Sequence, residues 1–177
     1  MTLPYSSLQG VASQRQRDYG RDMRIAIASD HAAVALKGEL AAWLREAGHE
    51  VADLGTDGEA SVDYPDYGYI LADAVAHGEA ERGIALCGSG IGIAIAVNRH
   101  PAARCALVSE PLSARLAREH NDANVIALGA RLIGLDMAKA CVEAFLTTDF
   151  AGANDPTSRH CARVEKLAHP RFHGVHA

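Results

Sequence analysis

Residues 82–97 read RGIALCGSGIGIAIAV, an apolar run followed by a glycine-rich turn and a second apolar run. The first run, 82–87, has the length and composition of a buried strand, and 91–97 is typical of a helix start. Cys87 therefore stands where a strand ends and the free N–H groups of a helix point outward. Such amides favour an anion, and they favour a thiolate over a thiol.

The glycines of this turn are weak support for a dinucleotide site. Gly88, Gly90 and Gly92 give the spacing GxGxG instead of GxGxxG, and they lie in the middle of the chain. A nucleotide site is the less favoured alternative for this turn.

Short β-type runs alternate with longer amphipathic runs along the chain, a pattern typical of a parallel sheet covered by helices on both faces. Strands are expected at 24–29, 50–54, 82–87, 104–108 and 124–128. Helices are expected at 33–47, 67–75, 91–97, 111–120, 135–147 and 159–168. The sequence therefore predicts an α/β fold, a three-layer, doubly wound, Rossmann-like parallel sheet of about five strands. The helix at 159–168 is short and should dock on another element.

The 177 residues suffice for one domain with a core of its own. Residues 1–22 are polar and lack an apolar period, and residues 169–177 are rich in histidine. We expect a disordered N-terminal extension over 1–22, a single domain over 23–168 and a disordered tail over 169–177. The histidines of the tail have no carboxylate or cysteine nearby, which favours a solvated tail over a metal site.

The net charge of −5 is spread over interspersed acidic and basic residues, which gives no reason to expect a nucleic-acid partner. No apolar run is long enough to cross a bilayer, and no secretory signal is visible. The four cysteines show no CxxC spacing, and two of them, Cys105 and Cys141, lie in apolar runs typical of a core. These features predict a protein of the reducing cytoplasm with no membrane partner.

In doubly wound sheets, ligands bind beyond the carboxyl ends of the strands. Polar or glycine-rich segments follow four of the predicted strands: 30–31, 87–92, 109–110 and 129–131. We therefore expect a site for a small molecule at this edge, although topology alone does not define its chemistry.

Five short segments carry a more specific signal: SDHA at 29–32, DYPD at 63–66, CGSGIG at 87–92, REHNDAN at 118–124 and RHCAR at 159–163. In this order, they resemble type B ribose-5-phosphate isomerase, a family shared with galactose-6-phosphate isomerase subunits and allose-6-phosphate isomerase. The likeness runs from about residue 23 to about residue 167. It implies interconversion of ribose 5-phosphate and ribulose 5-phosphate, a reaction of the pentose phosphate pathway, without a cofactor or metal. It also implies homodimers, or dimers of dimers, with sites at the subunit interface.

The resemblance gives Cys87 the role of the base that moves a proton between C1 and C2 through an enediolate, and His120 the role of opening the sugar ring. The residues that it implies for substrate binding are Asp30, His31, Gly88, Ser89, Gly90, Ile91, Gly92, Asn121, Arg131, Arg159 and Arg163. The types of residue suit these roles. Backbone amides stabilise a developing oxyanion, imidazole exchanges protons near neutral pH, and two arginines four apart on a helix share a face that fits a phosphate.

The chain departs from the family pattern in three places. Ala33 replaces a common glycine after the Asp-His-Ala triplet, and the loop before Arg159 is longer than usual. Ile93 stands where some relatives have a glutamate base, which leaves Cys87 as the base candidate in this loop.

Simpler interpretations of the same residues stay open. Cys87 could be a core residue, His120 could complement a helix dipole, and Asp30 could be a helix N-cap. Arg159 and Arg163 could form surface ion pairs with Asp155 or Glu165. Two alternative functions also remain: an isomerase of a six-carbon sugar phosphate, such as allose 6-phosphate or galactose 6-phosphate, and a non-catalytic phosphosugar-binding module.

Overall fold

The computed structural model describes residues 21–171, so the expectations for residues 1–20 and 172–177 lie outside the described part. Its strands are β1 (Arg24–Ser29), β2 (Glu50–Asp53), β3 (Arg82–Cys87), β4 (Cys105–Leu107) and β5 (Val125–Gly129). They form one sheet in the order β2-β1-β3-β5-β4, and every pairing is parallel. The predicted α/β class and doubly wound parallel sheet are confirmed, and β4 is shorter than expected.

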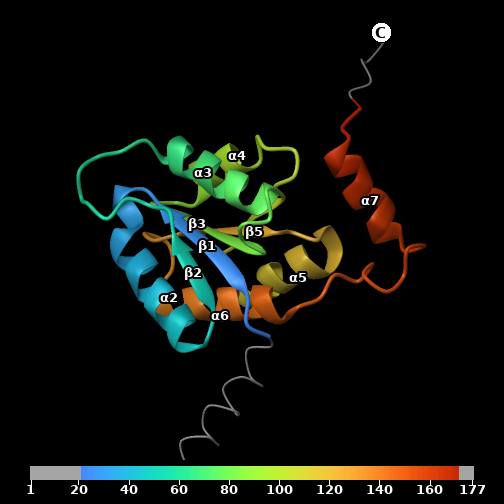
Figure 1. Ribbon diagram of the computed structural model, residues 1–177, viewed down its shortest axis with the longest axis horizontal. Coiled ribbons are helices and arrows are strands. Elements are labelled where there is room, and N and C mark those ends of the chain that lie inside the picture. The colour runs from blue at the N-terminus through green and yellow to red at the C-terminus, as the bar shows by residue number, and fades with distance from the viewer. Residues whose placement is uncertain (1–20, 172–177) are drawn as a thin grey trace, which may run out of the picture.

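The helices are α2 (Val34–Glu46), preceded by the 3-10 turn η1 (His31–Ala33), α3 (Tyr64–Ala76), α4 (Ile91–Val97), α5 (Pro111–Asn121), α6 (Leu135–Thr147) and α7 (Arg159–Ala168). Helices α2, α5 and α6 cover one face of the sheet, and α3 and α4 cover the other (Figure 1). Helix α3 begins three residues earlier than the periodicity indicates, because Pro65 fits its first turn.

The two faces of the sheet carry side chains of different size. In β1, Ile25 and Ile27 point into the core with α2, α5 and α6, while Ala26 and Ala28 point toward α3 and α4. The small residues let α3 and α4 lie close to the sheet and to each other. Cys87 belongs to this second, thinner layer.

Helix α7 lies apart from the layers, at the right of Figure 1, and none of its residues is buried. Its neighbour in the fold is α5. The expected docking of this helix is therefore present but slight. Among residues 21–171, no helix has the length and apolar character that crossing a membrane requires.

Candidate active site

Cys87 is the last residue of β3, and the chain turns sharply after it into α4. The backbone N–H of Gly90 donates a hydrogen bond to Cys87 Sγ at 3.1 Å, and the N–H of Ile91 donates to Ser89 Oγ at 3.3 Å. Cys87 is 4% exposed in the single chain. The sulfur is thus shielded from bulk water and held in one orientation by an amide, a contact that strengthens when the sulfur is ionised.

Glycine is required in this turn because the backbone lies directly against the end of β5. Gly90 has φ 75°, and a Cβ there would lie 2.6 Å from the Leu107 side chain and 2.9 Å from the carbonyl carbon of Leu128. A Cβ on Gly129 would lie 2.7 Å from the backbone of Ser89. Residues 87–92 therefore form a backbone cradle of fixed shape, which we call the thiol cradle.

Hydrogen bonds join the thiol cradle to the neighbouring loops at the carboxyl edge of the sheet. Asp30 N–H donates to the Leu86 carbonyl at 3.3 Å, and Arg131 N–H donates to the Gly88 carbonyl at 3.0 Å. The Arg131 guanidinium also lies over Gly88, where a Cβ would be 3.3 Å from its Cζ. The structure thus brings the predicted residues Asp30, Gly88 and Arg131 together at one edge, beside Cys87.

Asp30 and His31 are both held by contacts within the loops. The buried Asp30 carboxylate accepts a hydrogen bond from Ala32 N–H at 2.9 Å, so its N-cap role is real. His31 Nδ1 accepts a hydrogen bond from Val62 N–H at 3.2 Å. A neutral His31 therefore carries its proton on Nε2, which is left to donate.

A buried lysine holds the loop that supplies Val62. Lys37 Nζ lies 2.5 Å from Asp53 Oδ1 and 3.0 Å from Asp57 Oδ1. Burial acts to lower the pKa of Lys37, but the hydrogen bonds to the two carboxylates outweigh it and raise this pKa. The charged lysine therefore ties the carboxyl end of β2 and the loop that follows it to α2, and so supports the position of His31.

Tyr64 belongs to the thiol cradle region, although the sequence interpretation left it out. Its ring packs on Gly92, where a Cβ would lie 2.6 Å from Tyr64 Cζ. The DYPD segment is part of the family likeness, but a turn and a helix start explain its residues without a substrate contact, so Tyr64 was not among the expected site residues. A tyrosine at the start of a helix at the carboxyl edge was the available clue.

His120 and Asn121 lie at the other end of the sheet. Helix α5 begins after β4 at the carboxyl edge and returns to the amino edge, where Asn124 N–H bonds the carbonyl of Arg104, the residue before β4. A five-residue strand such as β5 is about 15 Å long. Within one chain, the structure therefore does not bring His120 and Asn121 to Cys87.

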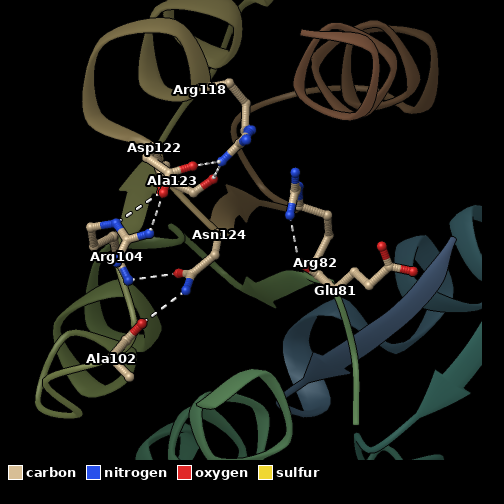
Figure 2. A network of polar contacts seen from close by, with 8 residues as sticks. All are labelled: Glu81, Arg82, Ala102, Arg104, Arg118, Asp122, Ala123 and Asn124. Carbon is tan, nitrogen blue, oxygen red and sulfur yellow. Dashed lines mark hydrogen bonds and ion pairs between the residues drawn. The ribbon is translucent and has the colours of Figure 1, made fainter. Parts of the chain in front are cut away.

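Two polar residues of the REHNDAN segment, Arg118 and Asp122, serve to end α5. Arg118 donates to Asp122 Oδ1 at 2.8 Å and to the Ala123 carbonyl at 2.6 Å, and Arg104 donates to both the carbonyl and the carboxylate of Asp122 (Figure 2). Asp122 takes the left-handed conformation, φ 46°. This network fixes the last turn of α5 and hence the direction of the neighbouring His120.

Arg159 and Arg163 lie on α7, on the same side of the molecule as His120. The rings of His120 and His160, the second residue of α7, are stacked, with centroids 4.7 Å apart. Both arginines are exposed, and in residues 21–171 neither forms an ion pair with Asp155 or Glu165. The alternative of surface pairing is therefore absent from the described chain. We call His120, Asn121, Arg159 and Arg163 the histidine cluster.

The remaining thiols differ from Cys87. Burial raises the pKa of Cys105 to about 12, and burial, with a contribution from Glu110, raises the pKa of Cys141 to about 11. Both remain protonated at neutral pH, as the core interpretation of these residues expects. Across the described residues, no three His, Cys, Asp or Glu side chains converge as metal ligands.

The fold and this edge define a class: an α/β protein with a thiol in a glycine-rich backbone turn at the carboxyl edge of a parallel sheet. Residues 25–167 match the family described as Ribose/Galactose Isomerase. The chain is 45% identical to ribose-5-phosphate isomerase B of Escherichia coli over 144 residues, which cover 81% of this chain and 93% of that protein. It is 40% identical to D-erythrulose-4-phosphate isomerase of Pectobacterium atrosepticum over 149 residues, 83% of this chain and 94% of that one.

A solved structure agrees with the sequence relatives. Ribose-5-phosphate isomerase B of Clostridium thermocellum superposes with a TM-score of 0.79 at 48% identity, over 82% of this chain and 95% of that one. The chain belongs to the ribose/galactose isomerase family, and it is a sugar-phosphate isomerase.

Proposed function

We propose that the chain interconverts ribose 5-phosphate and ribulose 5-phosphate, with Cys87 as the base and His120 as the residue that opens the sugar ring. The observation that carries this proposal is the hydrogen bond from Gly90 N–H to Cys87 Sγ within a cradle of backbone amides. A thiol in such a place can accept a proton from carbon while nearby amides stabilise the charge that develops on oxygen. The names of the E. coli and C. thermocellum relatives support ribose 5-phosphate as the substrate.

The reaction then has two parts. In the first, His120 takes the proton of the O1 hydroxyl and gives a proton to the ring oxygen as the C1–O bond breaks, which yields the open aldehyde. In the second, the Cys87 thiolate removes the proton from C2, and the electron pair moves through C1 to O1 to give an enediolate. The same proton returns to C1 as the C2 carbonyl forms, and the O2 proton passes to O1, which becomes the C1 hydroxyl of the ketose. Amides of Gly88 to Gly92 stabilise the oxyanion, and Arg131 holds the sugar.

The division of these residues between two ends of the sheet supports a homodimer with two shared sites. Close to the thiol cradle, Ile91, Ile95 and Leu107 are 51%, 52% and 45% exposed. They line a groove of about 350 Å³, and a second groove of about 420 Å³ lies between β4 and α7, with Asn121 and Leu167 in its wall. A two-fold contact over this surface would bring the histidine cluster of one copy to the thiol cradle of the other, twice.

Two further features belong to this proposal. The four cysteines, all within the described part of the chain, are free thiols, which fits a reducing compartment such as the cytoplasm. Arg159 and Arg163 would hold the phosphate, so the distance between them and Cys87 in the assembled site sets the length of sugar that fits. The Pectobacterium relative is named for a four-carbon substrate, and sugar length must therefore be measured for this chain.

The test is a steady-state assay of the wild type and Cys87→Ala, with Cys141→Ala, a thiol in the core on the opposite face of the sheet, as the matched control, on ribose 5-phosphate, allose 6-phosphate and galactose 6-phosphate. We expect the highest kcat/KM on ribose 5-phosphate, a loss of about 10³-fold in Cys87→Ala, and little change in the control. Turnover that persists in Cys87→Ala would contradict its role as base. A preference for a six-carbon sugar would select that alternative, and binding without turnover in the wild type would select the binding module. Loss of activity with a chelator would contradict a metal-free reaction.

A further inference from the structure

His160 lies in the RHCAR segment but has no role in the reaction as proposed. Its ring covers one face of the His120 ring: the centroids are 4.7 Å apart, and the planes differ by only 7°. This contact joins α7 to the last turn of α5, at a place where α7 buries none of its residues. Parallel rings at this distance form a directional contact that fixes their relative orientation.

The start of α7 is anchored independently of this stack. The N–H of Ala151 donates to the carbonyl of Glu119 at 2.9 Å, and Ser158 caps the helix by accepting from His160 N–H at 3.3 Å. Cys161 packs against Gly152, whose carbonyl lies 3.5 Å from its sulfur. The backbone of His160 is therefore placed by local contacts, and its ring can serve as a fixed plate against His120.

His120 has little else to hold its ring. Its side chain is 42% exposed, and its ion-pair neighbour, the Glu119 carboxylate, lies 3.8 Å from Nε2, too far for a good hydrogen bond. Ring opening demands that one imidazole exchange protons with both O1 and the ring oxygen of the sugar. An imidazole free to rotate would meet this demand only part of the time, and misplacement of a reacting group by about 1 Å can cost about 10²-fold in rate.

We propose that His160 is a positioning residue for His120, whose stacked ring fixes the plane in which the His120 imidazole presents its protons to the cyclic sugar. This inference rests on the proposed role of His120. It confines the effect of His160 to ring opening, since the proton transfer at C1 and C2 belongs to Cys87. A flat apolar ring should serve equally well, because His160 Nδ1 is buried without a hydrogen-bond partner in the described chain.

The test compares His160→Ala and His160→Phe with Lys166→Ala, an exposed change on the same helix. Ribose 5-phosphate is supplied as a ring, whereas D-erythrulose 4-phosphate, for which the Pectobacterium relative is named, and its aldose product are both open because their C4 oxygen carries the phosphate. We expect His160→Ala to lower kcat on ribose 5-phosphate about 10- to 100-fold with little change in KM, while kcat on D-erythrulose 4-phosphate stays near that of the wild type. His160→Phe and Lys166→Ala should stay within about threefold of the wild type on both sugars.

Equal losses on both sugars, or a KM effect alone, would overturn the proposal and indicate a role in docking α7. A His160→Phe variant as poor as His160→Ala would overturn the stacking argument. A readout independent of turnover is the proton NMR spectrum of the His120 ring. Its resonances should carry a ring-current shift in the wild type and His160→Phe and lose it in His160→Ala. A wild type inactive on both sugars would contradict the proposed function. An unchanged His120 resonance in His160→Ala would instead contradict the role of His160 as a positioning residue.

Discussion

At the carboxyl edge of the sheet, the polar residues lie on loops whose backbones are hydrogen-bonded to one another and packed against the end of β5. At the amino edge, His120 lies in the last turn of α5, and the helix that packs against it, α7, buries none of its residues. The thiol cradle is thus rigid within a single chain, whereas the histidine cluster rests on a slightly docked helix. In the shared site that we propose, one chain would therefore hold the thiol cradle in its final position by itself, whereas the position of the histidine cluster would depend also on the docking of α7.

The largest effect that we expect comes from mixing two inactive variants, which tests whether the thiol cradle and the histidine cluster act in one shared site. Cys87→Ala and His120→Asn should each lose nearly all activity. In a dimer with shared sites, a mixed pair contains one site with both residues intact. Random exchange makes half of the dimers mixed, so the mixture should recover about a quarter of the wild-type activity. The measurement is turnover of ribose 5-phosphate after subunit exchange.

The control for this experiment mixes two differently tagged preparations of Cys87→Ala, which must stay inactive. Absence of recovery, with exchange demonstrated by capture of both tags in one particle, would mean that Cys87 and His120 do not act in a shared site.

A second prediction tests the close packing of the thiol cradle at the carboxyl edge. Gly129→Ala should lower the free energy of unfolding by about 1–3 kcal/mol, because its Cβ would overlap the backbone of Ser89. The thiol cradle must then shift, and activity should fall with stability. The matched control is Gly38→Ala in α2, which has open space around its Cβ and should raise the free energy of unfolding by about 0.5–1 kcal/mol. Urea unfolding measures the free energy of unfolding of both variants. Equal changes in Gly129→Ala and Gly38→Ala would refute the close packing of the thiol cradle.

The residues of the carboxyl edge could be predicted from the sequence because the patterns that indicate them are local. The apolar run before Cys87 and the glycines after it define a strand, a turn and a helix start within sixteen residues, and the bounds of β3 and α4 agree with that pattern. Asp30 and Arg131 follow from topology, since parallel strands bring their carboxyl ends together. The position of Tyr64 could not be predicted, because its contact with Gly92 depends on how a loop folds back, and no periodicity in the sequence encodes this.

The amino edge was harder to predict for a physical reason. The REHNDAN segment mixes one residue of proposed chemical function with residues such as Arg118 and Asp122 that form the turn out of α5. Their types are equally suited to catalysis, and only the geometry separates them. The position of α7 could not be predicted either, because a helix with no buried residue is placed by a few side-chain contacts. The stacking of His120 on His160 is one of these contacts.

The smallest predicted effect concerns acid sensitivity at the amino edge. His49, buried where β2 begins, accepts a hydrogen bond from Met23 N–H at 3.3 Å through Nδ1. Burial lowers its pKa below the ordinary value of 6.5, although the nearby Asp22 opposes the shift. Below pH 6.5 the imidazole of His49 therefore binds a proton more readily in the unfolded chain than in the folded one. The contribution of neutral His49 to stability is present above that pH and is lost as the pH falls toward the pKa of His49 in the folded protein.

His49→Gln keeps an acceptor for Met23 without a titrating ring, and its free energy of unfolding should fall less between pH 7 and pH 5 than that of the wild type. The exposed His77→Gln serves as control and should follow the wild type. Parallel pH profiles of the free energy of unfolding for the wild type and His49→Gln would show that this buried imidazole does not contribute to the acid sensitivity of the fold.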